Sequence, residues 1–369
     1  MNELQWFELE NADELDSPAL VVYKDRVTEN IRALVKRVND VSRVRPHVKT
    51  HKMAEVCSLM LAEGITKFKC ATIAEAEMLA SAGAPDVLLA FQPVGPKVSR
   101  FLKIVRNFPA VKFSCLTDSI PSAKALSASA AENALQLNVF IDLNVGMNRT
   151  GILPAVAMPL IEAVKKLPAL SFAGLHAYDG HIADANIEVR KQRSSDAFRS
   201  VEQLASSVEN MYGIKPVIVA GGSPTYAFYA DRAGVECSPG TFVFWDRSYQ
   251  KMMPEEPYRP AALVICRVVS IVDKTRLCLD LGHKSLSADH PQPRVYFLNA
   301  PDAVPLSHSE EHLVVTVPET AAHHIGEIFY GIPQHVCPTV ALYERAAVAV
   351  ENRITEEWEV TARNKKLKW

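Results

Sequence analysis

The feature that most constrains how this chain can fold is an alternation of short apolar runs with segments of helical periodicity between residues 44 and 242. The runs are rich in β-branched residues and end in polar or Gly/Pro residues, as strands do. Strands that are apolar throughout are typical of parallel sheets covered by helices, and eight βα units can close on themselves, so the pattern predicts an α/β fold with a (β/α)8 TIM-type barrel. The expected strands span 44–50, 67–72, 86–91, 112–118, 135–143, 170–178, 216–223 and 235–242, and the expected helices include 54–64, 73–83, 94–107 and 189–211.

The pattern changes near residue 250. Beyond it, β-rich segments follow one another with turns between them and with hardly any helical periodicity, which predicts a mostly antiparallel β domain. One more strand, expected over 18–24, precedes a helix expected over 25–39 and lies outside the barrel series. The expected division is an N-terminal segment over 1–24, a barrel over 25–248 and a C-terminal β domain over 249–369.

The composition is that of an ordinary globular enzyme. Of 369 residues, 48% are hydrophobic and 22% charged, and the formal net charge is only -2, which argues against nucleic acid or an anionic membrane as partner and favours a small molecule. The chain shows no signal-peptide pattern and no apolar stretch near the length of a membrane span. Seven cysteines without a CxxC pair indicate reduced thiols. We therefore expect a cytoplasmic protein.

Polar residues gather where the expected barrel strands end. In (β/α)8 barrels the active site is built at the C-terminal ends of the strands, so these residues are candidates for a site, although loops are polar in any case. They are Lys49, Thr72, Gln92, Asp118, Asn144, His176, Tyr178, Ser223 and Gly240.

Lys49, in the stretch RPHVKTHK (45–52), is the most informative of them. It ends an apolar strand, and like-charge repulsion from His47, His51 and Lys52 would favour its neutral, nucleophilic amine. A lysine of this kind can form a Schiff base with a carbonyl compound. The alternative is a surface lysine in a basic loop.

The seventh and eighth expected strands end in glycine-containing turns. Barrels often bind phosphate there through backbone N–H groups, and Gly222 allows a close backbone approach while Ser223, Thr225 and Thr241 offer hydroxyls. A reactive lysine and a phosphate cradle in one barrel suggest pyridoxal 5'-phosphate as cofactor, because its aldehyde needs the first and its phosphate needs the second.

Seven motifs in one order now resemble a known family. The chain is similar over nearly its whole length to the D-threonine aldolase and D-serine dehydratase-like group of alanine racemase-fold (fold type III) pyridoxal phosphate enzymes. The motifs are RPHVKTHK (45–52), NVGMNRTG (144–151), GLHAYDGH (174–181), AGGSPTY (220–226), SPGTFVFWD (238–246), LDLGHKSLSADH (279–290) and PQHVCPT (333–339).

The resemblance implies a role for each matching residue. Lys49 would be the Schiff-base lysine and a proton-transfer base, Arg149 would face the pyridine nitrogen, His176 would pack against the pyridine ring, and Tyr178 would lie near cofactor or substrate. The N-terminal strand would join the C-terminal β domain, and the chain would form a homodimer with the active site at the subunit boundary. The phosphate would be held by Gly222, Ser223, Gly240 and Thr241.

His335 and Cys337 are candidate metal ligands. Residues two apart in a strand project to the same face, so imidazole and thiolate could hold one ion, and zinc accepts both nitrogen and sulfur. The resemblance to the metal motif of the family makes a divalent metal expected, zinc first and manganese second. Two cues disagree about the branch of the family. Cys337 favours the dehydratases, which have cysteine and zinc where the aldolases have aspartate and a manganese-type site. The motif GLHAYDGH is closer to the aldolase-like bacterial members.

The implied reaction is that of a lyase acting on D-3-hydroxy amino acids. Removal of the hydroxyl proton would cleave Cα–Cβ to glycine and an aldehyde, as in D-threonine aldolase, whereas α-proton removal by Lys49 and loss of the hydroxide would give a keto acid and ammonia, as in D-serine dehydratase. His51 or His181 could serve as base on the hydroxyl. Two other classes remain open: a racemase, which needs a second base and no metal, and a non-catalytic pyridoxal phosphate carrier.

Overall fold

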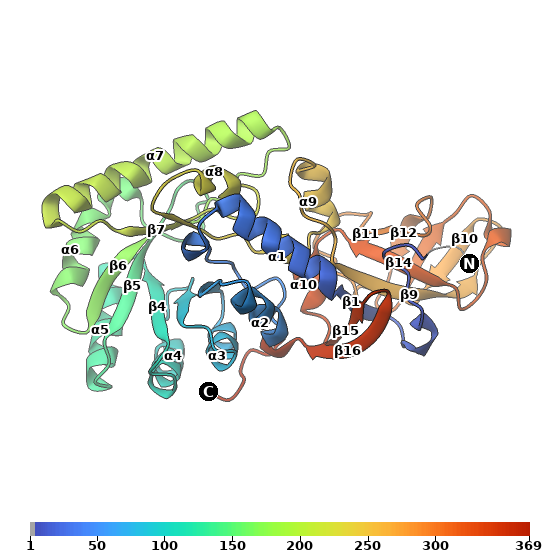
Figure 1. Cartoon of the computed structure of the whole chain (residues 1–369), viewed down its shortest axis with the longest axis horizontal. Coiled ribbons are helices and arrows are strands. Elements are labelled where there is room, and N and C mark those ends of the chain that lie inside the picture. Colours follow the sequence, from blue (N-terminus) through green and yellow to red (C-terminus); the bar gives the residue numbers. More distant parts are fainter. Residues whose placement is uncertain (1–3) are drawn as a thin grey trace. The chain divides into compact units, whose positions relative to one another are not determined.

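The computed structural model describes residues 4–369 and divides into two compact units (Figure 1). The barrel unit contains Leu34–Lys49, Cys57–Gly240 and the C-terminal Asn364–Trp369. The β unit contains the N-terminal segment up to Ala33, the short stretch Thr50–Val56, and Thr241–Arg363. Each unit is described by itself below.

The barrel unit contains seven parallel strands in the order of the sequence. The segment 44–48 completes the ring, because the N–H of Arg45 donates to the carbonyl of Cys237 on one side and the N–H of Val48 to that of Lys69 on the other, both at 2.9 Å. The predicted barrel is therefore confirmed. The strands are β2 (Lys67–Cys70), β3 (Asp86–Leu89), β4 (Lys112–Thr117), β5 (Leu137–Leu143), β6 (Leu170–Ala177), β7 (Val217–Ala220) and β8 (Val235–Cys237).

Helices alternate with these strands, and Figure 1 shows α4 and α5 on the outer side of the sheet. Their ends follow local sequence: the hydroxyl of Thr72 accepts the N–H of Glu75 at the start of α3, and Asn186 caps α7, which ends at Gly213 with φ +65°. No helix within residues 4–369 is long and apolar enough to cross a bilayer. The helices are α1 (Lys24–Val38), α2 (Ala54–Ala62), α3 (Ile73–Ser81), α4 (Pro96–Asn107), α5 (Ile120–Glu132), α6 (Met158–Lys166), α7 (Ile187–Tyr212) and α8 (Tyr226–Ala230).

The barrel interior is layered. At the N-terminal ends of the strands, buried Arg45 bridges Asp86 and Glu236. An apolar cluster of Leu88, Leu116, Phe140 and Val219 fills the middle. These filled layers close the middle of the barrel, so a site at the C-terminal ends of the strands is reached from that end.

The β unit is a nine-stranded sheet. Its β1 (Ala19–Tyr23) comes from the N-terminus and pairs antiparallel with β9 (Ala262–Ile271) and parallel with β15 (Arg345–Val350). All other pairings of the sheet are antiparallel, which confirms the expected β domain. The remaining strands are β10 (Arg276–Leu279), β11 (Val295–Phe297), β12 (Val304–His308), β13 (Leu313–Thr316), β14 (Ile328–Pro333) and β16 (Arg353–Glu359), and two short helices are α9 (Arg247–Met252) and α10 (Val336–Val340).

Candidate active site

Lys49 lies in a turn that follows the barrel-closing segment, not in the strand itself. Its backbone N–H donates to Nδ1 of His47 at 3.2 Å, which fixes where the turn begins. Its ammonium lies 5.7 Å from the ring centre of Tyr178. The structure thus brings Lys49 and Tyr178 together within the barrel unit.

The ring of Tyr178 is surrounded by three cations. Besides Lys49, the ammonium of Lys69 lies 5.5 Å and the guanidinium of Arg149 5.3 Å from the ring centre. A β-carbon at Gly222 would come within 3.1 Å of the Tyr178 ring, so a larger residue would require the ring to shift by a few tenths of an ångström. Sequence reasoning missed Lys69, which is buried within β2 although it is one of two lysines in this short strand.

Arg149 is carried by a loop that leaves and rejoins the end of β5. The side-chain oxygen of Asn144 accepts the N–H groups of Gly146 and Asn148 at 3.0 and 3.1 Å, which holds the loop compact. The next residue, Thr150, donates its hydroxyl to Asp142 at 2.9 Å. Arg149 is exposed, so its guanidinium is available to a ligand.

His176 projects from β6 and is buried. Its Nδ1 lies 2.8 Å from Oδ1 of Asp142. Burial lowers the pKa of His176, and although burial opposes it, the hydrogen bond from His176 leaves the pKa of Asp142 below its ordinary value. His176 is therefore a neutral ring that donates from Nδ1 to a carboxylate, and its buried Nε2 has no hydrogen-bond partner within residues 4–369.

The predicted phosphate cradle forms two adjoining turns. The N–H of Gly222 donates to the hydroxyl of Thr225, which donates to the buried carboxylate of Asp179 at 2.7 Å. The N–H of Gly240 donates to the hydroxyl of Ser223 at 3.3 Å. Gly222, Ser223 and Gly240 are thus brought together in the barrel unit, and Thr241 follows them in the chain as the first residue of the next segment of the β unit.

A cavity of about 480 Å³ opens at the C-terminal ends of β2 to β5. Phe91, Val94 and Leu116 give it an apolar wall, and Asp118 and Arg149 give it charged groups. The volume is large enough for an organic ligand.

His51 is fully buried in the β unit. Its Nδ1 accepts the N–H of Met53 at 3.1 Å, and burial lowers its pKa to about 3. The like charge that the sequence led us to expect from His51 beside Lys49 is therefore absent near neutral pH. Because Nδ1 accepts, the proton of the neutral ring sits on Nε2, which is buried and has no partner in the described part of the chain.

His181 follows Asp179 in the loop after β6. A β-carbon at Gly146, whose φ is +117°, would lie 2.8 Å from Nε2 of His181, so this glycine lets the two loops approach each other. The buried Nδ1 of His181 is the third histidine nitrogen at the expected site that has no hydrogen-bond partner within residues 4–369.

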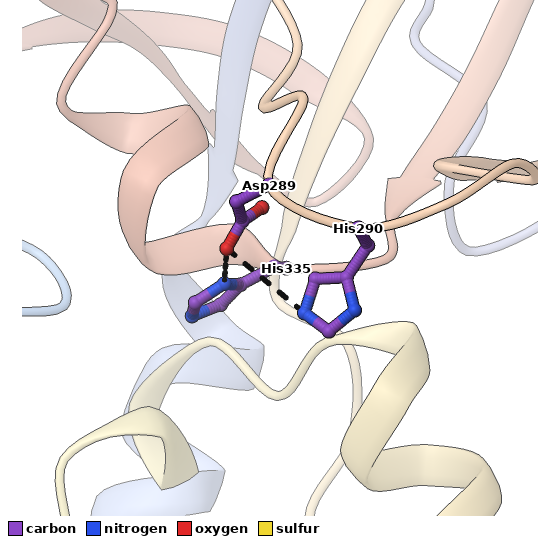
Figure 2. A group of neighbouring side chains, drawn as sticks. All are labelled: Asp289, His290 and His335. Carbon is purple, nitrogen blue, oxygen red and sulfur yellow. Dashed lines mark hydrogen bonds and ion pairs between the residues drawn. The ribbon is translucent and has the colours of Figure 1, made fainter.

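His335 and Cys337 lie at the start of α10, with His335 as its N-terminal capping residue. The expectation of a strand was wrong, because the chain turns into a helix after Pro333. Nδ1 of His335 lies 2.5 Å from Oδ2 of Asp289, as Figure 2 shows. Burial opposes ionisation of His335, but hydrogen bonds with Cys337 and Asp289 raise its pKa to about 9.

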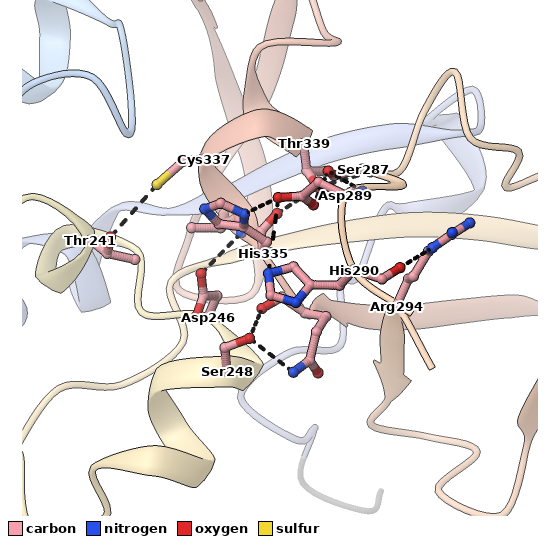
Figure 3. A network of polar contacts seen from close by, with 12 residues as sticks. Thr241, Asp246, Ser248, Ser287, Asp289, His290, Arg294, His335, Cys337 and Thr339 are labelled. Carbon is pink, nitrogen blue, oxygen red and sulfur yellow. Dashed lines mark hydrogen bonds and ion pairs between the residues drawn. The ribbon is translucent and has the colours of Figure 1, made fainter. Parts of the chain in front are cut away.

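The sulfur of Cys337 is close to two hydroxyls. Sγ lies 3.2 Å from Oγ1 of Thr50 and 3.6 Å from Oγ1 of Thr241. Figure 3 shows the contact with Thr241. The N–H of the intervening Val336 donates to the buried carboxylate of Asp246 at 3.1 Å, which fixes the turn that carries both donors.

A second donor group shares His335. One ligand atom each from Asp289, His290 and His335 lie within 4.8 Å of one another. Sequence reasoning missed Asp289 and His290 as donors, although both close the motif LDLGHKSLSADH on which the resemblance rests. They come close to His335 only through the fold of the β unit.

Two family models match the chain. Residues 22–248 match the family described as alanine racemase, N-terminal domain, and residues 261–349 match a serine dehydratase domain family. The first match covers more than half of the chain.

Known relatives are similar over nearly their whole length. The D-threonine aldolase of Arthrobacter sp. is 28% identical over 95% of this chain and 93% of its own. The crystal structure of the D-threonine aldolase from Filomicrobium marinum has a TM-score of 0.88 at 26% identity, covering 97% of this chain and 98% of its own. The D-threo-3-hydroxyaspartate dehydratase of Delftia sp. is 24% identical over 94% of this chain and 97% of its own, and its solved structure has a TM-score of 0.83.

Both domains, in this order, are those of one group of enzymes. The resemblance found in the sequence motifs is therefore confirmed. The chain belongs to the alanine racemase N-terminal domain family and, within it, to the D-threonine aldolase and D-serine dehydratase-like group of pyridoxal phosphate-dependent lyases.

Proposed function

We propose that this enzyme is a divalent-metal-dependent lyase that cleaves D-3-hydroxy amino acids by a retro-aldol reaction, as a D-threonine aldolase does. The observation that carries the metal dependence is the placement of His335 beside Cys337, with Asp289 fixing the imidazole. The choice of retro-aldol cleavage is supported by the motif GLHAYDGH (174–181) and by the similarity to a D-threonine aldolase. A racemase does not need such a pair of metal ligands, and a non-catalytic carrier of the cofactor does not need a metal.

The barrel unit supplies the cofactor site. Pyridoxal phosphate, when bound, would withdraw electrons from the substrate carbon, and Lys49 is the amine that would hold its aldehyde. The exposed guanidinium of Arg149 would face the pyridine nitrogen and, because Arg149 is always charged, would keep that nitrogen unprotonated. His176, a neutral imidazole fixed by Asp142, would pack against the pyridine ring, and Tyr178 lies close to both Lys49 and Arg149.

Backbone and hydroxyl donors hold the phosphate. Gly222 brings the chain close to the ligand, Ser223 and Thr241 offer hydroxyls, and Gly240 offers its backbone. Two local observations support this assignment. Gly222 packs closely against Tyr178, and the N–H of Gly240 donates to the hydroxyl of Ser223 at 3.3 Å.

His335 and Cys337 hold the metal, zinc in preference to manganese. When bound, the ion acts as a Lewis acid toward the 3-hydroxyl of the substrate. The hydrogen bond that Nδ1 of His335 donates to Asp289 would leave Nε2 to hold the ion, as in carboxylate–histidine–zinc sites. The hydroxyls of Thr50 and Thr241 lie within hydrogen-bonding distance of the Cys337 sulfur. A thiolate together with an imidazole is a ligand pair that favours zinc.

The two candidate bases differ in what their rings can do. His51 presents an N–H at Nε2 because its Nδ1 already accepts from Met53, so we assign it as a hydrogen-bond donor. His181 lies in the loop after β6 with a buried Nδ1 that has no partner within residues 4–369. We therefore assign removal of the hydroxyl proton to His181.

The alternative reaction is elimination, as in a D-serine dehydratase. Cys337 favours it, because cysteine occupies this position in the dehydratase branch. In that case Lys49 would remove the α-proton, and the products would be a keto acid and ammonia.

We further propose a cytoplasmic homodimer. All seven cysteines are free thiols, and five of them are buried, which suits a reducing compartment. The dimer is supported by the family resemblance.

The distribution of products from D-threonine decides between the two reactions. Metal-loaded holoenzyme is incubated with D-threonine, and glycine, acetaldehyde, 2-oxobutanoate and ammonia are measured together. We expect glycine and acetaldehyde in equal amounts, whereas 2-oxobutanoate with ammonia would assign the dehydratase reaction. D-serine and 3-hydroxy-D-aspartate, tested in the same way, define the preferred side chain.

A further inference from the structure

Lys69 is a buried amine that the proposed mechanism has not used. It lies on β2, forms a parallel bridge with His47, and is only 2% exposed. Lys67, two residues earlier on the same strand, pairs with Glu236 at the other end of the barrel. The ammonium of Lys69 has no such partner: among residues 4–369 it makes no hydrogen bond or ion pair, only the contact with the Tyr178 ring.

The charged groups around Lys69 do not neutralise it. Lys49 and Arg45 repel it, and Arg149 lies against the same tyrosine ring. The two carboxylates that attract it already have other partners: Asp142 binds His176 and Thr150, and Asp179 accepts from Thr225 and Tyr229.

The unpaired, buried position of Lys69 destabilises its charged form. Burial and the repulsion by Lys49 lower the pKa of Lys69 to about 7. A lysine that is nine-tenths buried without a carboxylate of its own is unfavourable unless a ligand supplies the anion. Lys69 is therefore a buried amine for which the described part of the chain provides no anionic partner.

We infer that Lys69 pairs with the phenolate oxygen of bound pyridoxal phosphate. This inference rests on the proposed function, with Lys49 as the Schiff-base lysine. The cofactor brings two anionic groups, and the phosphate is assigned to the turns at Gly222 and Gly240. The phenolate is attached next to the ring carbon that carries the aldehyde, so it must lie near Lys49, where Lys69 shares the Tyr178 ring.

Two measurable effects follow. Pairing with the phenolate strengthens cofactor binding, because a charge-assisted contact replaces an unpaired buried amine. A cation at this oxygen also favours the deprotonated Schiff base, which carries one more negative charge, so the pH at which the visible absorbance changes is lowered. Loss of Lys69 should reverse both effects.

The test uses purified holoenzyme of the wild type and of Lys69→Met, Lys69→Arg and Lys67→Met. For Lys69→Met we expect cofactor affinity to fall on the order of 10- to 100-fold and the spectral midpoint to rise by roughly one pH unit. The melting temperature of its apoprotein should not fall, because methionine removes a buried amine while keeping the side-chain length. Lys69→Arg should keep much of the spectral shift, and Lys67→Met should keep both cofactor affinity and midpoint.

Borohydride reduction and peptide mapping separate this inference from the proposed function. If wild-type protein is labelled at Lys49 while Lys69→Met keeps wild-type affinity and midpoint, the pairing is wrong and the proposed function stands. If no lysine is labelled, or if Lys69 carries the label, both are overturned.

Discussion

Replacing Asp289 by asparagine should weaken metal binding, because the imidazole of His335 would be held less firmly in its orientation. The carboxylate lies 2.5 Å from Nδ1 of His335 and also accepts the hydroxyl of Ser287. Loss of such an outer carboxylate lowers metal affinity by about 10- to 100-fold. Because His335 and Asp289 are 35% and 44% exposed, solvent screens their interaction, and we expect a loss near tenfold, or about 1.4 kcal/mol.

The assay is competition for zinc between the enzyme and a coloured chelator, with the visible band of the cofactor followed in the same sample. His290→Ala is the matched control, because His290 is a neighbour in the second donor group and is not assigned as a ligand. It should change zinc affinity by less than about twofold, which is below the effect of a lost ligand. An equal loss in His290→Ala would show that Asp289, His290 and His335 bind the metal directly, and unchanged affinity in Asp289→Asn would refute the positioning role.

Lys49→Ala should lose the visible band and the borohydride-stable label, and label on another lysine would defeat the assignment of the Schiff base. The buried His51, with its pKa lowered from 6.5 to about 3, should cause the free energy of unfolding to fall by about 1.4 kcal/mol for each pH unit below 6.5, because the unfolded chain binds the proton that the folded ring refuses. Urea denaturation at pH 7.5 and 5.5 should show a larger loss in the wild type than in His51→Gln, and equal losses would contradict the burial argument. Cys337→Asp should shift metal preference toward manganese, because carboxylate is the harder ligand, as measured by metal content after exposure to both ions. Light scattering should give a dimer, and a fully active monomer would contradict the proposed assembly.

The barrel could be predicted from the sequence because its signal is repeated. Each apolar run such as 137–143 is followed by a helical segment, and one error among eight does not hide the pattern. The segment around Lys49 was harder to predict in detail, since the chain leaves the strand direction immediately after closing the ring. The ends of regular elements depend on hydrogen bonds such as that of His47 with the N–H of Lys49, which residue patterns do not reveal.

The polar site was predictable where motifs are local and was missed where the fold joins distant segments. His335 and Cys337 are two apart in sequence, but Asp289 reaches His335 from 46 positions away. The state of His51 was also misjudged, because its neighbours in sequence are charged whereas its surroundings in space exclude water. Lys69 was overlooked for a related reason: that its side chain is buried inside the barrel depends on the closure of the sheet, which the short sequence of β2 does not reveal.

The most direct test of the lyase assignment is the metal dependence of turnover with a defined stereoisomer. Metal-loaded holoenzyme, the same protein after exhaustive chelation, and the chelated protein with zinc restored are each given D-threonine and L-threonine, and glycine release is measured while the cofactor absorbance is recorded. The account predicts glycine from D-threonine only, its loss on chelation with the absorbance intact, and its return with zinc. Full turnover after chelation, or interconversion of the stereoisomers without glycine, would contradict it.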